Sequence, residues 1–100
     1  MFFITCLERI QRNDRGFLIC GTRRTFGYFP TLEEAESALN NNLCDMHEYL
    51  YDYALIEEIH YGIHPDVQQE FWFQWDFEKR GFFRIEKPKE TVGKHNFALG

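Results

Sequence analysis

Residues 2–10 alternate between two partly apolar faces, which is the periodicity of a β-strand. A polar cluster at 12–16 predicts a turn, and the apolar run at 17–20 predicts a second strand. We expect these two strands to pair as an antiparallel hairpin. Gly21 and Gly27 then predict a bulge or bend ahead of the aromatic run at 26–29.

The clearest local signal in the chain is a helix start at Thr31. Its hydroxyl is placed to cap the first amides, while Glu34, three residues later, reaches back to the Thr31 amide; this arrangement is a capping box. Apolar residues follow at helical spacing: Leu32, Ala35, Ala38 and Leu39. Three asparagines at 40–42 end the pattern. A helix of about ten residues must rest on a sheet to be stable.

The rest of the chain predicts three more strands. Residues 43–50 fit either a turn or a second short helix, whereas residues 51–59 alternate again, and strongly apolar runs follow at 71–75 and 82–85. After Pro88 the tail looks irregular, although Phe97, Ala98 and Leu99 are apolar enough to dock on the sheet.

The order strand, strand, helix, strand, strand, strand predicts one α+β domain over residues 1–100. Its short connections favour a mainly antiparallel sheet of about five strands, with the helix covering one face. The pattern does not determine the order of the strands in the sheet. Exposed aromatic rings would favour a homodimer, because two-fold association is the commonest way to cover apolar surface.

Composition sets the class of protein. The chain is 44% hydrophobic and 18% aromatic, which suffices for a core in a domain of 100 residues. No stretch approaches the roughly 20 apolar residues that a membrane-spanning helix needs, and no signal peptide is evident. Cys6, Cys20 and Cys44 form no CxxC motif and have apolar neighbours, so we expect buried, reduced thiols and a cytoplasmic protein.

Charge is unevenly distributed along the chain, whose formal net charge is −5. Residues 25–78 hold twelve acids and no Lys or Arg, whereas the segments before and after them are net basic. Cross-strand pairing with the basic ends would absorb part of this pattern. The helix and residues 43–52, however, have no basic partner nearby in the sequence.

We therefore expect an exposed acidic face that docks on a basic protein partner, because opposite charge steers association. Such a face disfavours direct contact with nucleic acid, since phosphate contact requires Lys and Arg. The residues expected on this acidic face are Glu33, Glu36, Asp45, Glu48, Asp52, Glu57 and Glu58.

A second hypothesis is a site for a small, nucleotide-like ligand. Guanidinium groups would bind its anionic part and aromatic rings would stack on its planar part. The candidate residues are Arg23, Arg24, Tyr28, Tyr51 and Trp72. Packing in the core is the competing explanation for the aromatic rings.

A third hypothesis is a small ribonuclease. Small guanyl-specific ribonucleases combine one helix with an antiparallel sheet and use Glu, Arg and His. Here Glu57 or Glu58, with His60 and Arg84, would imitate that set. Such enzymes need a basic cleft for phosphate, and nothing in the spacing marks one.

No motif predicts a metal, a cofactor or a catalytic nucleophile. His60 and His64 have the spacing of metal ligands on a helix, but Gly62 and Pro65 break any helix there. The polar group at Asp45, His47 and Glu48 is better explained by local hydrogen bonding than by proton transfer. A binding protein without enzymatic activity is the favoured interpretation.

Several short segments give the chain a resemblance to a known group of proteins. They are FGYF at 26–29, EEA at 33–35, CDMHE at 44–48, YALIE at 53–57, WF at 72–73 and IEKP at 85–88. With them the chain resembles small uncharacterised proteins of Firmicutes and their mobile elements. The resemblance implies a bacterial or phage accessory protein, such as an inhibitor of a defence or nucleic-acid-handling protein. It attaches no activity and transfers no functional residue.

Overall fold

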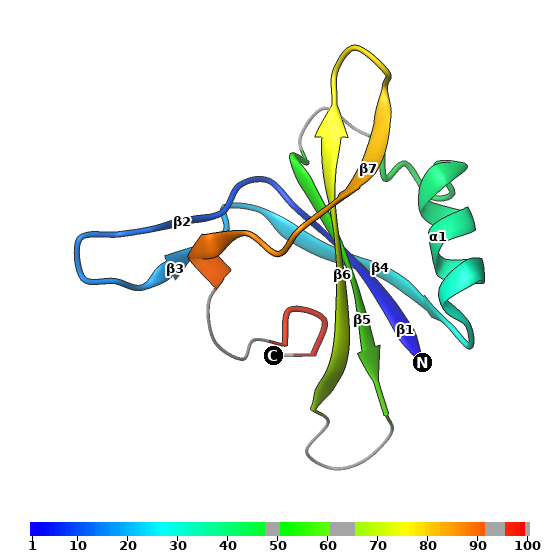
Figure 1. Ribbon diagram of the computed structural model, residues 1–100, viewed down its shortest axis with the longest axis horizontal. Coiled ribbons are helices and arrows are strands. Elements are labelled where there is room, and N and C mark those ends of the chain that lie inside the picture. Colours follow the sequence, from blue (N-terminus) through cyan, green and yellow to red (C-terminus); the bar gives the residue numbers. More distant parts are fainter. Residues whose placement is uncertain (48–50, 61–65, 92–95, 100) are drawn as a thin grey trace.

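The computed structural model describes residues 1–47, 51–60, 66–91 and 96–99. Its elements are β1 (Phe2–Leu7), β2 (Gln11–Arg12), β3 (Leu18–Ile19), β4 (Arg23–Phe29), α1 (Leu32–Asn40), β5 (Tyr53–Ile59), β6 (Val67–Asp76), β7 (Gly81–Ile85) and the 3-10 helix η1 (Lys89–Thr91). Five strands form an antiparallel sheet in the order β4-β1-β5-β6-β7, with α1 on one side of it (Figure 1). The predicted α+β fold is confirmed.

Strand β1 lies inside the sheet and, together with β2, forms one arm of the predicted antiparallel hairpin. It pairs with β4 on one side and with β5 on the other. The predicted second arm at 17–20 contains β3, which pairs with β2 in a two-stranded ribbon beyond the end of the sheet. Hydrogen bonds from the amide of Arg9 to the Cys20 carbonyl and from the amide of Glu8 to the Thr22 carbonyl join this ribbon to the β1–β4 ladder, so the predicted hairpin is confirmed. The aromatic run at 26–29 is part of β4. Because β1 is apolar on both faces, it suits an interior strand that is covered from both sides.

Both faces of the sheet are covered by apolar side chains. On the face toward α1, the buried cluster includes Ile4, Leu39, Ile56 and Phe73. On the opposite face, Leu7, Leu55 and Trp72 pack with Phe97 from the C-terminal segment. Figure 1 shows that segment and the β2–β3 ribbon on the side of the sheet away from α1. This second layer covers the middle of the sheet, whereas residues of the edge strands β4 and β7 remain exposed.

Helix α1 begins where the capping signal predicts. The Thr31 hydroxyl accepts a hydrogen bond from the Glu34 amide at 3.2 Å, and the apolar stripe of the helix is buried. Beyond the helix, Asn42, Cys44 and Asp45 have φ values of 52°, 67° and 60°. Left-handed residues at three of four positions prevent a second helix, so residues 41–47 form turns. Residues 48–50 lie outside the described part.

The three cysteines are free but not equally buried. Cys6 is buried, Cys20 is half-buried and Cys44 is exposed. The expectation of three buried thiols is therefore wrong for Cys44, because the turns after α1 carry it to the surface. Burial raises the pKa of the Cys6 thiol to about 12. Among the described helices, none has the length and apolarity needed to cross a membrane.

Candidate functional site

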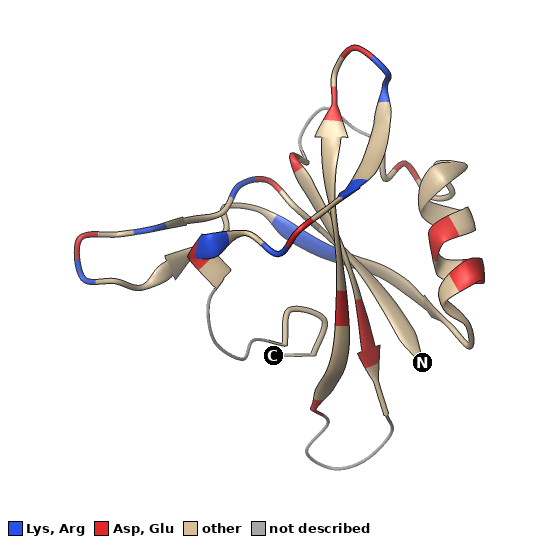
Figure 2. Ribbon diagram, viewed as in Figure 1, with Lys and Arg blue, Asp and Glu red and all other residues tan. Residues whose placement is uncertain are grey.

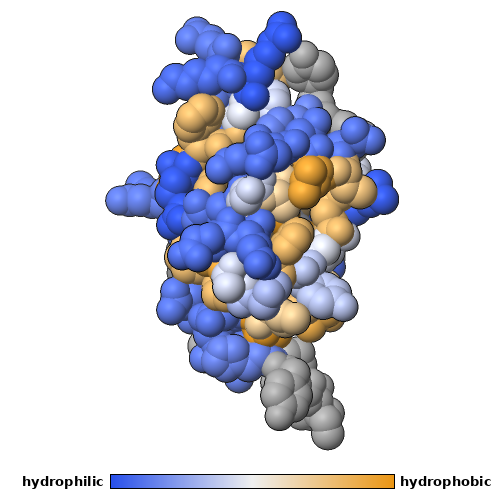
Figure 3. All heavy atoms as spheres, turned by 90° about the vertical axis from the view of Figure 1, so that its right-hand side faces the viewer, coloured by the Kyte–Doolittle hydropathy of each residue, from blue (hydrophilic) through white to orange (hydrophobic). Residues whose placement is uncertain are grey.

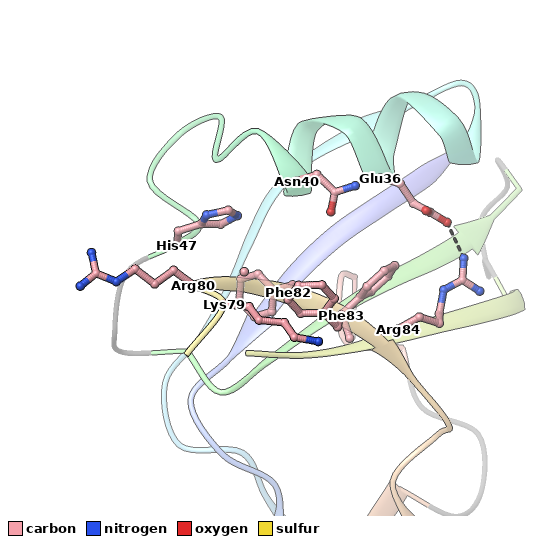
Figure 4. Close-up of a pocket in the computed structure, with 10 residues that line it drawn as sticks. Glu36, Asn40, His47, Lys79, Arg80, Phe82, Phe83 and Arg84 are labelled. Atoms are coloured by element: carbon pink, nitrogen blue, oxygen red, sulfur yellow. Dashed lines mark hydrogen bonds and ion pairs between the residues drawn. The ribbon is translucent and has the colours of Figure 1, made fainter. Parts of the chain in front are cut away.

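A groove of about 640 Å³ lies between the C-terminal half of α1 and strand β7. One wall consists of Glu36 and Asn40 of α1 and of His47 from the turns that follow. The other wall consists of residues 79–84, which cover the end of the β6–β7 turn and most of β7 (Figure 4). We call this cavity the α1–β7 groove.

The α1–β7 groove is lined by more positive than negative charge. Lys79, Arg80 and Arg84 are basic, and Glu36 is the one acid in its lining. The Arg84 guanidinium forms an ion pair with Glu36. Among the residues that the structure describes, Lys79 and Arg80 form no ion pair. The groove therefore keeps two uncompensated cations in a chain whose net charge is −5.

Aromatic rings hold the cations of the groove in place. The Arg84 guanidinium carbon lies 4.9 Å from the ring centroid of Phe71 and 5.2 Å from that of Phe73. The Lys79 ammonium lies 5.0 Å from the ring centroid of Phe83. A cation over an aromatic face is attracted by the ring quadrupole. These contacts limit the freedom of Lys79 and Arg84 before any partner arrives.

His47 closes one end of the α1–β7 groove. Its Nε2 lies 2.5 Å from the Leu39 carbonyl oxygen, and a carbonyl can only accept, so Nε2 carries a proton. The ring packs edge-on against Trp75 and Phe82, with centroids 5.3 Å and 5.7 Å away. Local hydrogen bonding, as predicted for this polar group, is confirmed for His47.

Among the described residues, those predicted for an acidic face do not share one exposed surface. Figure 2 shows acidic positions on α1 and, apart from it, on strands β5 and β6. Glu33 and Asp45 are exposed, but Glu36 is neutralised by Arg84 in the α1–β7 groove. Glu58 lies on β5, with its carboxylate 3.6 Å from Nε2 of His60. The expected acidic residue Glu48 lies outside the described part of the chain. The cation that neutralises Glu36 comes from β7, and no pattern in the sequence places those two elements together.

Asp52 also fails to join an open acidic surface. It is half-buried just before β5, and burial raises the pKa of its carboxyl, with a smaller contribution from the nearby Glu8 carboxylate. Its backbone amide donates to the Leu7 carbonyl oxygen at 3.0 Å. Asp52 thus sits at the junction of β1 and β5, away from α1.

Glu57 is buried on the face of the sheet opposite α1, so its assignment to an exposed acidic face is wrong. Its side chain is 0% exposed. Its two carboxylate oxygens accept hydrogen bonds from the backbone amides of Phe97 and Ala98, each at 3.0 Å. Burial raises the pKa of Glu57 to about 7 against the lowering effect of these two amides, and the carboxylate of Glu70 raises it further. The C-terminal segment covers this carboxylate, and the charge pattern gives no sign of that cover.

The five residues proposed for a nucleotide-like ligand do not converge. Trp72 and Tyr51 are only 2% and 4% exposed, and they belong to the clusters on opposite faces of the sheet. Arg23 lies over the ring of Phe97 and Arg24 over that of Phe26. Tyr28 is exposed and packs against Phe3. The rings are buried because both faces of the sheet are covered.

The residues of the ribonuclease hypothesis are also separated. Glu57 and Glu58 are neighbours on β5 and therefore face opposite sides of the sheet. Only Glu58 lies beside His60, and Arg84 is engaged by Glu36. His64 lies outside the described residues. Within the described ranges, no group of three His, Cys, Asp or Glu side chains is arranged to hold a metal ion.

A second, smaller hollow of about 380 Å³ lies on a different side of α1. Its apolar lining comes from Phe29, Ala38 and Leu43, and Leu43 is 55% exposed. Glu33 and Glu34 border it, and neither is ion-paired with any residue in the described part of the chain. Figure 3, in which the α1 side of the molecule faces the viewer, shows apolar side chains exposed between hydrophilic ones. We call this the acidic hollow.

Comparisons with known proteins identify no relative of this chain. No protein-family model, no curated protein and no solved structure matches it. The kinship with proteins of mobile elements therefore stays a prediction, as does a role as an inhibitor.

Proposed function

We propose that this protein is a binding protein that holds an anionic partner in the α1–β7 groove. The observation that carries the proposal is the pair of cations, Lys79 and Arg80, which line the groove and form no ion pair with any described residue. The chain as a whole is acidic and repels anions at long range. Binding of an anion must therefore depend on this local cluster.

The shape and lining of the groove support binding. Its volume of about 640 Å³ falls in the range usual for ligand sites. Phe82 and Phe83 line it beside the cations, so a partner is able to bury apolar atoms while its charge is matched. The side-chain amide of Asn40 supplies a further donor on the opposite wall.

The titratable groups of the groove support binding more than proton transfer. The Nε2 proton of His47 is held by the Leu39 carbonyl, and the carboxylate of Glu36 is held by Arg84. A general acid or base must reach the reacting group with a proton or lone pair that is free to move. In this geometry, the groups that are free to meet a partner are the donors Lys79 and Arg80.

Charge reversal within the groove tests the proposal. The double variant Lys79→Glu/Arg80→Glu is compared with Arg9→Glu/Arg15→Glu, which changes the net charge equally at exposed positions outside the groove lining. The probes are a fluorescein-labelled glutamate-rich peptide, ATP and inorganic phosphate, followed by anisotropy or calorimetry at low and high salt. We expect saturable, salt-sensitive binding of at least one probe that is lost in the groove variant and kept in the control. Absence of binding by all three, or equal loss in both variants, would overturn the proposal.

A second candidate function is favoured by the acidic hollow. Glu33 and Glu34 border its apolar lining without a basic neighbour among the described residues, which fits a basic segment of a protein partner that inserts an apolar side chain. Of the residues predicted for an acidic face, this site uses Glu33, and the structure adds Glu34 beside it. A fluorescein-labelled peptide of alternating Lys and Leu is the probe, and Glu33→Lys/Glu34→Lys should weaken its binding. The control Glu78→Lys/Glu86→Lys should not, and equal weakening would show that only net charge matters.

A further inference from the structure

The α1–β7 groove runs along the free edge of β7. Successive side chains of a strand point to opposite faces of the sheet, yet four consecutive residues of β7, 81–84, line the groove. Gly81 has no side chain and contributes only backbone atoms. Phe73 of β6 also lines the groove, so the groove covers the α1 face of β7 and extends around the edge of that strand.

That edge carries unpaired backbone groups. β7 is the last strand in the order β4-β1-β5-β6-β7, and within the described ranges its pairing is with β6. Half of the N–H and C=O groups of an edge strand point away from its neighbour and are ready to pair with another chain. The groove gives an incoming strand room beside these groups.

The side chains along the free edge of β7 favour a partner strand that carries acidic residues. On the α1 side of β7, an added strand would meet Arg84 and Asn40. At the turn end it would meet Arg80, and next to the half-exposed ring of Phe83 it would meet Lys79. Carboxylates near the turn end of an added strand would therefore find the unpaired cations Lys79 and Arg80, and its apolar side chains would pack on the ring of Phe83.

The same cations argue against a second copy of this chain as the occupant. Parallel pairing of β7 with the β7 of a second copy would bring Lys79 and Arg80 of both copies together, and like charges facing each other across strands are destabilising. Charged residues along an edge commonly serve to prevent such self-pairing. An acidic segment of a partner protein would instead be attracted by these cations.

From this geometry we infer that β7 accepts an added strand from an extended acidic peptide segment of a partner protein. The backbone of the segment hydrogen-bonds along the free edge, and its carboxylates bind Lys79 and Arg80. This is the strand-addition mode of peptide recognition, in which backbone bonds supply affinity and flanking side chains supply specificity. The inference rests on the proposed function and names the chemistry of the partner in that groove.

The test separates backbone pairing from charge. A labelled, capped peptide of about eight alternating Glu and Val residues, long enough to span the strand, is compared with the same peptide N-methylated at alternate amides. Both carry the same charge, but only the first forms a full ladder of hydrogen bonds. We expect the unmodified peptide to bind at least about tenfold more tightly, and we expect alternate amides of residues 81–85 to become protected from hydrogen exchange.

Each other outcome overturns a specific claim. Equal binding of the two peptides, or binding without protection of β7 amides, overturns strand addition and leaves the groove as a simple anion site. Failure of both peptides while ATP or phosphate binds also overturns strand addition. Failure of every anionic probe in wild-type protein overturns the proposed function itself. A peptide of alternating Lys and Val that binds as well as the acidic one overturns the choice of an acidic partner.

Discussion

The Glu57 carboxylate accepts a hydrogen bond from the backbone amide of Phe97, which lies forty residues further along the chain, at 3.0 Å. This contact joins the interior strand β5 to the C-terminal segment. Glu57 stands directly opposite Glu70 on β6, so two carboxylates face each other beneath that segment. The Glu70 side chain is in turn bound by the ammonium of Lys87, at 2.8 Å. The buried carboxyl group of Glu57 thus holds the second layer onto the sheet.

The stability of the protein should depend on pH through Glu57. Burial raises the pKa of its carboxyl from 4.5 to about 7 in the folded state. The folded protein then binds more protons than the unfolded chain between these values, so the free energy of unfolding falls as pH rises through this range. The shift corresponds to a loss of about 3 kcal/mol at most. Urea unfolding at about pH 5 and pH 8 measures it.

The variant Glu57→Gln should remove this part of the pH dependence, because the amide does not titrate. Glu58→Gln is the matched control, since Glu58 is the next residue on β5 and points to the other face. We expect the control to keep the pH dependence of the wild type. If Glu57→Gln titrates like the wild type, the source of the dependence lies elsewhere.

Removing the ring of Phe97 should loosen the second layer. The ring is buried and packs edge-on against Trp72, with centroids 5.9 Å apart. Phe97→Ala should cost about 3–5 kcal/mol, as for other buried aromatic residues, and should shift the fluorescence of Trp72. Leu99→Ala, at an exposed position of the same segment, should change stability by less than about 0.5 kcal/mol. Similar losses in the two variants would contradict the packing seen here.

The Thr31 cap should contribute measurably to the stability of α1. Its hydroxyl accepts from the Glu34 amide, and Thr31→Ala leaves that amide without its partner. We expect a loss of about 1 kcal/mol in chemical denaturation, whereas Thr31→Ser should retain most of the stability. A loss of equal size in the serine variant would point to the methyl group of Thr31 instead of its hydroxyl.

The three thiols should react at very different rates in the native protein. Cys44 is exposed, Cys20 is half-buried with a raised pKa, and Cys6 is buried with a pKa of about 12. Because the thiolate is the reactive form, a disulfide reagent at neutral pH should modify Cys44 first and Cys6 only when the protein unfolds. Cys44→Ser should abolish the fast phase, and a fast phase that survives would contradict this order.

Local features of the chain were predictable from the sequence alone. The start of α1 at Thr31, its buried stripe, and the strands near 51–59, 71–75 and 82–85 all follow from capping and periodicity, which involve residues only a few positions apart. The presence of one helix on a mainly antiparallel sheet also follows, because the short connections leave few alternatives. These signals do not depend on distant contacts.

Only the tertiary structure determined which strands pair with each other and which charged groups are buried or form ion pairs. Pairing of β1 with β5 placed the predicted hairpin inside a five-stranded sheet, and the C-terminal segment buried Glu57 and Trp72. In the α1–β7 groove, Glu36 forms an ion pair with Arg84, which lies forty-eight positions further along the chain. Alternation along a strand tells which residues share a face, but it does not tell what covers that face. Charge in a sequence likewise shows which groups exist, while distance in the fold determines which of them neutralise each other.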